Sequence, residues 1–333
     1  MKIIMHELLK SFFLESKNLT KQEAKKIFLA LSNGQINPIQ AISIAIMYNC
    51  RKPTLEELNG FIEALMDLCL KINLNEFNAV DIVGTGGDGK NTFNISTLTS
   101  FIVAASGEKV IKHGNFGFSS KHGSSNILKT LGYQFTNNEN TLKKQLELTG
   151  FCYLHAPIFH PILKVVSYVR KQFGFRTLFN ILSPLLNPGN PKNQLLGVSD
   201  LESARLYAYL YQDKNINFSI IHSLDGYDEI TLTSDIKCYT SKEERIYTLE
   251  ELGINKINPI ELTGGKNSEE NKKIFLKILS GEGTIAQTKV VLWNASFALS
   301  LINSDSIQNN YERAKQTLES GKANTILKKF LNI

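Results

Sequence analysis

The first 72 or so residues combine apolar segments with polar residues that begin helices. Thr20 is followed three positions later by Glu23, and Thr54 by Glu57, and each pair matches the capping box of a helix N-terminus. Pro38 has a fixed φ that suits the first turn of a further helix. These signals predict a small, wholly helical unit at the N-terminus.

A different pattern begins at Ala79, where apolar runs alternate with helical stretches and glycines stand at the helix ends. The order is AVDIV, NISTLTSFIVAASG, KVIKHG and SSNILKTLG, and a later run, NFSIIHS, predicts another strand. Because strand, crossover helix and strand follow one another, the sheet is expected to be at least partly parallel. We therefore predict an α/β fold: a small all-helical N-terminal domain and a larger α/β domain whose central sheet is mixed, mostly parallel and flanked by helices.

A second helical stretch, HPILKVVSYVRKQFG, interrupts the α/β pattern at residues 160–174. We expect it to belong with the N-terminal helices. The predicted small domain is residues 1–75, joined by a helical segment at about 160–190. The predicted α/β domain is residues 76–159 and 191–333.

The composition suits a globular protein with a sizeable core, since 42% of the 333 residues are hydrophobic and 20% are charged. No apolar run approaches the roughly 20 residues of a membrane-spanning helix, and we expect no signal peptide. Four cysteines lie far apart without a CxxC pair, which argues against disulfides and structural zinc and favours the cytoplasm. The net charge of +6 suits an anionic partner, although such an excess is more often only a solvated surface.

The segment DIVGTGGDGKNTFNIST, residues 81–97, places four glycines between a strand and a helix. It fits the dinucleotide-binding pattern GxGxxG, but the next strand ends in Lys112-His113-Gly114 instead of an acidic residue that binds a ribose. It also approaches the nucleotide-binding P-loop, except that Asn91 replaces the Ser or Thr that binds magnesium. A tight glycine turn without a ligand is the third interpretation.

All three interpretations share several free backbone N–H groups, an absence of Cβ atoms and the positive end of a helix that begins near Asn94. That combination suits a phosphate or a pyrophosphate. Asn94, Ser96 and Thr97 then cap the helix, contact the anion, or do both.

A second loop, KHGNFGFSSKHGSSN at residues 112–126, is rich in lysine, histidine, glycine and small polar residues. A solvated loop is the simplest interpretation. Because it follows a strand on the same side as the glycine loop, both are expected at the carboxyl edge of the sheet, where they would bind a ligand with more than one phosphate. His113 and His122 lack helical metal-ligand spacing, so we expect no histidine metal site.

Carboxylates follow the strand NFSII, in the loop IHSLDGYDEITL. Asp225, Asp228 and Glu229 are therefore expected at the same carboxyl edge. Neighbouring loop carboxylates are usually only exposed, but beside a pyrophosphate they become candidate magnesium ligands. The acid and base of a glycosidase are the alternative, and that chemistry needs no phosphate site.

Several motifs follow one another along nearly the whole chain: GTGGD, NIST, KHGN, HPxxKxVxxVRK, RTLFNILSPLLNP, QLLGV, GxDE, a GG pair at Gly264 and LWNA at Trp293. Their order and spacing resemble those of the anthranilate phosphoribosyltransferase family. The resemblance implies transfer of the phosphoribosyl group of 5-phosphoribosyl 1-pyrophosphate (PRPP) to the amino group of anthranilate. The products would be N-(5-phosphoribosyl)anthranilate and pyrophosphate, in L-tryptophan biosynthesis. It also implies a homodimer formed through the helical domain and a requirement for Mg²⁺, with two ions.

The resemblance assigns site residues by motif. The expected PRPP-binding residues are Gly84, Gly87, Asp88, Thr92, Asn94, Ile95, Ser96, Thr97, Lys112, His113, Gly114, Asn115, Ser119, Ser120 and Ser124. The expected metal ligands are Ser96, Asp228 and Glu229, with Glu229 bridging two ions. The expected anthranilate-binding residues are Gly84, Asn115 and Arg170. No covalent or dedicated acid-base residue is expected.

Elementary chemistry agrees with these assignments. The guanidinium fork of Arg170 matches a carboxylate geometrically. An aromatic amine is neutral at pH 7, so it can attack the ribose without strong base catalysis, and no Ser–His–Asp or Cys–His arrangement is evident. Catalysis then rests on positioning the substrates and neutralising the departing pyrophosphate. The cleft is expected between the two domains, where closure would exclude water.

Three positions depart from the commonest pattern of the family. Phe116 replaces the arginine that follows KHGN, Ser183 replaces a glycine before Pro-Leu, and Ser223 replaces a glycine after the strand histidine. The first departure alters the contacts expected of the loop, where an aromatic ring can shape the anthranilate pocket.

Two rival functions remain. A pyrimidine nucleoside phosphorylase shares the architecture, but we would expect a longer chain with a further C-terminal lobe. A non-catalytic nucleic-acid-binding relative would suit the basic balance, but it should have lost the glycine loop or the Asp-Glu pair. We therefore expect neither a nucleic acid nor a membrane as partner.

Overall fold

The chain folds into two compact units. The computed structural model describes residues 2–117, 122–163, 177–303 and 305–333. Met1–Lys71 packs with Ala156–Pro188 to form one unit, here called the helical unit. Ile72–His155 packs with Gly189–Ile333 to form the other, here called the α/β unit. Together they have the fold class that the sequence predicts, so that prediction is confirmed.

The described elements of the helical unit are all helices, and the first four follow one another through short connections. Its described elements are α1 (Lys2–Leu14), α2 (Lys21–Ser32), α3 (Pro38–Cys50), α4 (Leu55–Asp67), α8 (Ala156–Phe159), α10 (Leu178–Leu182) and the 3-10 helix η1 (Ser183–Leu185). The capping boxes at Thr20 and Thr54 form as predicted, and Asn37 forms another with Gln40. These caps satisfy amide groups that a helix N-terminus leaves without intrahelical partners.

Helices α2 and α4 approach each other closely because Gly60 has no side chain. A Cβ atom at Gly60 would lie 2.3 Å from the carbonyl oxygen of Lys21. Beside this contact the Arg51 guanidinium lies 2.6 Å from the Glu57 carboxylate, whose side chain is fully buried. The glutamate end of this ion pair is thus shielded from solvent, while the Arg51 side chain is 24% exposed.

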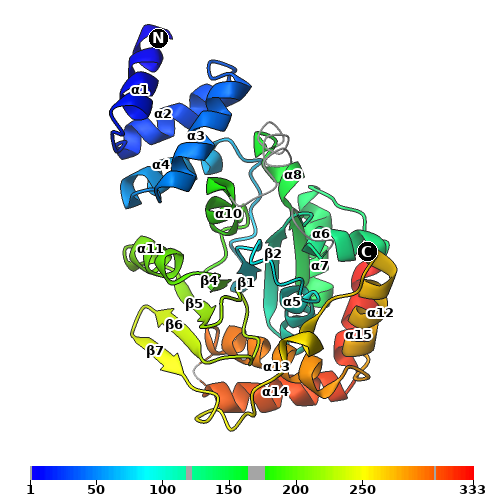
Figure 1. The fold of residues 1–333 in the computed structure, drawn as a ribbon. Helices are drawn as coiled ribbons and strands as arrows, with labels where there is room; N and C mark the ends of the chain where they lie inside the picture. The colour runs from blue at the N-terminus through cyan, green and yellow to red at the C-terminus, as the bar shows by residue number, and fades with distance from the viewer. Residues whose placement is uncertain (1, 118–121, 164–176, 304) are drawn as a thin grey trace. The chain divides into compact units, whose positions relative to one another are not determined.

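The α/β unit surrounds a single sheet, made in the described part of the chain by strands β1 (Ala79–Gly84), β2 (Lys109–Gly114), β3 (Phe151–His155), β4 (Asn193–Gly197), β5 (Asn217–Ser223), β6 (Ile236–Thr240) and β7 (Glu244–Tyr247). Its helices are α5 (Ile95–Ala105), α6 (Ser124–Thr130), α7 (Glu139–Thr149), α11 (Leu201–Gln212), η2 (Pro259–Leu262), α12 (Ser268–Leu279), α13 (Ile285–Ser300), α14 (Ile307–Glu319) and α15 (Lys322–Leu331). Figure 1 shows these helices around the sheet.

The strand order reverses its direction at β1. The order is β3-β2-β1-β4-β5-β6-β7, in which β1 to β5 run parallel and β6 and β7 are antiparallel (Figure 1). The chain moves to one side of β1 for β2 and β3, then to its other side for β4. Ligands of open α/β sheets bind where the strand order reverses in this way. Gly84 and Gly197, the last residues of β1 and β4, lie side by side there.

Helix α5 anchors the sheet to the rest of the α/β unit by packing against α13 and α15. Its Phe101 ring lies 4.4 Å from the ring of Phe151 and 5.8 Å from that of Phe330, and all three are fully buried. The N-terminus of α5 is therefore held by a rigid aromatic core. Among the helices described, none is long and apolar enough to cross a membrane.

Candidate functional site

The loop between β1 and α5 requires its glycines for conformational reasons. The backbone φ is positive at Gly86 (63°), Gly87 (72°), Gly89 (76°) and Asn91 (51°). Side chains with a Cβ atom disfavour this left-handed region, and asparagine tolerates it best among the other residues. The loop therefore presents bare backbone at the carboxyl edge of the sheet.

The N-terminus of α5 lies beside this loop, with Asn94 at the N-cap position. Among the described contacts, the Asn94 side chain makes no capping bond. Its Nδ2 instead donates to the carbonyl oxygen of His122, in the second loop. The Ser96 N–H donates to Glu229 Oε1 at 3.0 Å. Of the sequence alternatives for Asn94, capping by the side chain is therefore wrong, and its bond to the second loop was not foreseen.

Asp228 and Glu229 lie in the turn after β5 and reach two segments of the site. Asp228 Oδ2 accepts the Gly86 N–H at 2.6 Å, across 142 residues of sequence. Glu229 accepts the Ser96 N–H through Oε1 and the Thr92 hydroxyl at 3.4 Å through Oε2. The glycine loop, the start of α5 and the acidic turn thus meet, as the sequence prediction of a shared edge requires.

The carboxyl groups of Asp88 and Asp228 lie close enough to affect that of Glu229 where these three segments meet. Burial, followed by the charges of Asp228 and Asp88, raises the pKa of Glu229 well above its usual value, whereas the Ser96 amide and Lys112 act to lower it. The folded chain therefore disfavours ionised Glu229 in the absence of another positive charge. A cation at this point would relieve the repulsion.

Lys112 places one positive charge beneath the site. Its side chain is 1% exposed, and Nζ donates to the Ile82 carbonyl and to Ser96 Oγ at 3.2 Å. Burial lowers the Lys112 pKa to about 8, while the carboxylates of Asp81 and Glu229 act to raise it. A buried ammonium is thus fixed between the core of the sheet and the N-terminus of α5.

The donor set suits magnesium that also binds a substrate. Asp228, Glu229 and Ser96 offer carboxylate and hydroxyl oxygens, the ligand type that Mg²⁺ prefers. Within the described residues, no group of three or more His, Cys, Asp or Glu side chains could hold a metal ion. Because Mg²⁺ is commonly held by one or two carboxylates together with phosphate oxygens, the residues present fit a metal that arrives with a phosphorylated ligand.

Glycines at the ends of β1 and β4 make room for Asp228. A Cβ atom at Gly84 would lie 2.5 Å from Asp228 Oδ2, and one at Gly197 would lie 1.6 Å from the Asp228 carbonyl oxygen. The sequence prediction included Gly84 but assigned no role to Gly197. The signal was present, since the buried strand NQLLG ends in glycine at the carboxyl edge of the sheet.

The described part of the second loop closes on itself through backbone contacts. The Ser125 N–H donates to the Asn115 carbonyl at 3.2 Å, and the Gly117 N–H to Asn126 Oδ1 at 2.8 Å. A Cβ atom at Gly123 would lie 2.0 Å from the Gly117 nitrogen. This packing brings Asn115 to the N-terminus of α6.

The two loops are joined by side chains. Thr97 Oγ1 donates to Ser124 Oγ at 3.1 Å, which links α5 to α6. His122 Nδ1 lies 2.7 Å from Asn271 Nδ2, and a Cβ atom at Gly264 would lie 2.7 Å from the same ring. His122 therefore connects the loop to α12 and to the GG segment.

Some of the expected site residues lie outside the described part of the chain, and others are buried. Ser119, Ser120 and Arg170 lie outside the described residues. Ile95 is fully buried in the core, so only its backbone can face a ligand. His113 is 3% exposed, and its N–H donates to Asp81 Oδ1 at 3.4 Å, within the sheet.

Phe116, the departure from the family pattern, joins an aromatic cluster at the edge of the second loop. Its ring is 5.1 Å from that of His155 and 6.1 Å from that of Phe135, and the residue is 39% exposed. Gly114 faces the same cluster, since a Cβ atom there would lie 2.5 Å from the Tyr153 hydroxyl. The exposed part of the Phe116 ring is available to a ligand near Asn115.

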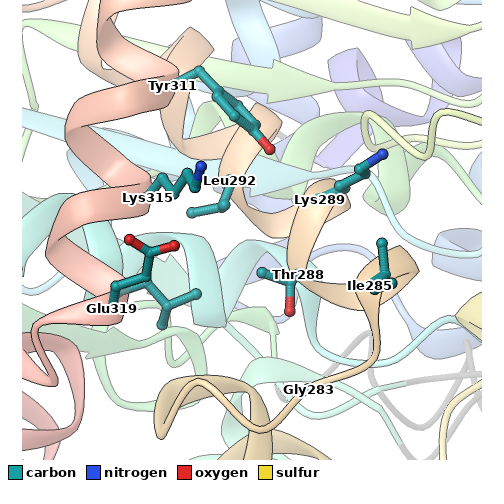
Figure 2. Close-up of a pocket in the computed structure, with 9 residues that line it drawn as sticks. Gly283, Ile285, Thr288, Lys289, Leu292, Tyr311, Lys315 and Glu319 are labelled. Atoms are coloured by element: carbon teal, nitrogen blue, oxygen red, sulfur yellow. The ribbon is translucent and has the colours of Figure 1, made fainter.

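A separate cavity of about 190 Å³ lies between α13 and α14. Figure 2 shows Tyr311, Lys315 and Glu319 of α14 on one side and Thr288 and Lys289 of α13 on the other. Its lining shares no residue with the glycine loop or the acidic turn. We therefore do not assign the predicted site to this cavity.

Comparison with known proteins places this fold and site in a class. Residues 76–324 match the protein family described as "Glycosyl transferase family, a/b domain". Residues 7–69 match the family described as "Glycosyl transferase family, helical bundle domain". Fold and site thus define a glycosyltransferase built from a helical bundle and an α/β domain. The anthranilate phosphoribosyltransferase of Flavobacterium johnsoniae is 47% identical over 328 residues, or 98% of this chain and 96% of the relative. The chain belongs to the anthranilate phosphoribosyltransferase family.

Solved structures agree with this membership. The anthranilate phosphoribosyltransferase of Thermus thermophilus is similar with a TM-score of 0.90 at 29% identity, covering 98% of each chain. The Saccharomyces cerevisiae enzyme, in complex with PRPP and Mg, has a TM-score of 0.89 at 24% identity. That second likeness covers 100% of this chain and 98% of the yeast chain and shows a shared fold.

Proposed function

We propose that this protein transfers the phosphoribosyl group of PRPP to the amino group of anthranilate. The products are N-(5-phosphoribosyl)anthranilate and pyrophosphate, in L-tryptophan biosynthesis. The observation that carries the proposal is the convergence of the glycine loop, the N-terminus of α5 and the Asp228-Glu229 turn at the carboxyl edge of the sheet. Relatives with 47% and 48% identity over nearly the whole chain bear the name of this activity.

The glycine loop and the second loop are the proposed PRPP site, with the residues that the family motifs assign, Ser119 and Ser120 included. Backbone N–H groups at a helix N-terminus and in a left-handed loop are suited to phosphate oxygens. Lys112 contributes a fixed positive charge beneath Ser96. Thr97 and Ser124 present their hydroxyls where the loops meet.

Magnesium is the proposed cofactor, held by Ser96, Asp228 and Glu229 together with PRPP oxygens. Two ions, with Glu229 between them, follow from the family pattern. The raised pKa of Glu229, caused by burial and by Asp228 and Asp88, supports a cation at this point. When bound, the metal neutralises charge that develops on the departing pyrophosphate.

Anthranilate is proposed to bind beside PRPP, through Gly84, Asn115 and Arg170. The role of the protein toward this substrate is to hold the amine against the ribose, because the amine needs no deprotonation before attack. The fork of Arg170 would pair with the anthranilate carboxylate.

The test is the fluorescence of anthranilate mixed with the protein and PRPP, with and without Mg²⁺. We expect a magnesium-dependent loss of fluorescence that is matched by the pyrophosphate released. If the protein is folded and both substrates are intact but the anthranilate fluorescence does not fall, the proposed activity is wrong. Phosphorolysis of pyrimidine nucleosides and salt-dependent DNA binding would then be measured.

Arg170→Ala should chiefly weaken the use of anthranilate. Loss of hydrogen bonds to a charged group costs roughly 1.5–3 kcal/mol, so we expect the KM for anthranilate to rise about 10- to 100-fold while the KM for PRPP changes little. Steady-state kinetics with each substrate varied in turn would measure both. Lys171→Ala is the matched control, because it removes the adjacent cation. Equal effects of the two variants would contradict the role of Arg170.

The protein is further proposed to be a cytoplasmic homodimer that associates through the helical unit. Leu14 of α1 and Ile39 of α3 are each 75% exposed, so apolar side chains on that unit are available to such a contact. Light scattering coupled to size exclusion would give the mass in solution. A monomer at working concentration would contradict the homodimer.

A further inference from the structure

The acidic turn is supported by a buried chain of hydrogen bonds that starts at Asp225. Thr233 Oγ1 donates to Asp225 Oδ2 at 2.6 Å, and the hydroxyls of Thr233 and Thr231 lie 2.7 Å apart. Ser223 Oγ lies 3.5 Å from the Thr231 nitrogen and 2.7 Å from the Glu229 carbonyl oxygen. Ser223, Thr231 and Thr233 are fully buried.

The carboxylate fixes the direction of the chain. An ionised carboxylate only accepts, so Thr233 donates to Asp225, and the Thr233 oxygen accepts from the Thr231 hydroxyl. The same Thr231 hydroxyl also lies within donor reach of Ser223 Oγ, at 3.3 Å. Both Thr231 groups approach Ser223 Oγ as donors, the N–H at 3.5 Å and the hydroxyl at 3.3 Å, so the proton of Ser223 itself goes to the Glu229 carbonyl. The orientation of this hydroxyl is thus set by its surroundings.

The backbone of Glu229 is consequently held on both sides. Ser223 binds its carbonyl oxygen, and Asn294 of α13 binds the next residue, accepting from the Ile230 N–H at 3.2 Å and donating to the Ile230 carbonyl at 2.7 Å. Among the residues that the structure describes, the Glu229 carboxylate meanwhile accepts only from the Ser96 amide and the more distant Thr92 hydroxyl. The orientation of the Glu229 side chain therefore depends mainly on the hydrogen bonds that hold its backbone.

We propose that Ser223 is a positioning residue for magnesium-dependent binding of PRPP, acting through the Glu229 carbonyl. The proposal rests on the proposed function. A glycine, which the commoner family pattern has here, offers no hydroxyl for this bond. In this chain the serine therefore adds a restraint on the acidic turn.

The experiment compares Ser223→Ala with Ser219→Ala. Both serines lie on β5, four residues apart and buried, but within the described part of the chain Ser219 Oγ contacts only the Cys238 sulfur, at 3.7 Å. Calorimetry would measure the Kd of PRPP with and without Mg²⁺, and thermal unfolding the stability without ligand. Loss of a bond that orients a metal ligand commonly costs 10- to 100-fold in metal affinity.

We expect Ser223→Ala to raise the Kd for PRPP with Mg²⁺ about tenfold and to leave the Kd without Mg²⁺ and the KM for anthranilate nearly unchanged. Ser219→Ala should bind as the wild type does. Ser223→Cys, which keeps a similar volume but donates weakly, should reproduce the alanine result if the alanine variant folds poorly.

The binding measurements distinguish failure of the proposed function from failure of the positioning role of Ser223. If wild-type protein does not bind PRPP even with Mg²⁺, the proposed function fails. If wild-type protein binds but the Ser223 variants bind equally well, the positioning role is wrong. A loss of affinity that is the same with and without Mg²⁺ also overturns it, because a merely structural role predicts that result.

Discussion

Glu229→Gln will remove most magnesium-dependent transfer and will make the unliganded protein harder to unfold. The amide keeps the shape of the side chain and can still accept the Ser96 N–H, but it lacks the charge that a metal ligand needs. We expect kcat/KM for PRPP to fall by about 100-fold or more. Stability should rise because burial and the charges of Asp228 and Asp88 raise the Glu229 pKa, so ionisation weakens the folded state.

The gain in stability has a defined pH dependence. The Glu229 pKa in the folded protein lies above its usual value of 4.5, so the destabilisation is absent below that value and grows as the pH rises toward the folded pKa. Thermal unfolding with a chelator present should show a Tm about 2 °C or more higher for the variant at pH 8, and equal values near pH 4. Glu250→Gln, on an exposed residue, is the control. Unchanged turnover, or a lower Tm at pH 8, would contradict the assignment.

Gly197→Ala should damage both stability and activity. A Cβ atom there would lie 1.6 Å from the Asp228 carbonyl oxygen, and backbone on both sides leaves no flexible group to move aside. Overpacking of this kind costs about 3 kcal/mol or more. Displacement of Asp228 should also reduce kcat/KM by about 100-fold.

Urea unfolding and steady-state kinetics would measure the two effects of Gly197→Ala. Gly281→Ala is the comparison, because Gly281 has a φ of 80° and no described atom within 4 Å of an added Cβ. That variant carries only backbone strain of roughly 1 kcal/mol. If the two variants lose equal stability and both retain activity, Gly197 does not shape the site.

Local patterns predicted the elements on which the site is built. KVIKHG and NFSIIHS coincide with β2 and β5, and AVDIV with β1 except for its last residue. Strands β3 and β4 were not individually predicted, and neither were the short strands β6 and β7. Strand β6 depends on antiparallel pairing with β5, and β7 on pairing with β6. Strand β7 is also largely exposed, so it lacks the apolar run that marks a buried strand.

The acidic turn was predicted to lie at the phosphate edge, because strand direction fixes which end of a parallel strand faces the ligand. Its partners were not predicted. The contacts of Asp228 with Gly86 and Gly197 depend on the order of strands in the sheet, and that order is decided by packing along the whole chain. The same limit applies to Asn94, whose side chain binds His122 instead of capping the helix, one of its two expected roles.

The amides of Gly86 and Ser96 already have acceptors in this structure, the carboxylates of Asp228 and Glu229. An anion that binds either amide must therefore take the place of a carboxylate, so its arrival is an exchange of partners. The displaced carboxylate is then left to face a cation. If an anion and a cation bind in this way, thermodynamic reciprocity requires that each changes the affinity of the protein for the other by the same factor.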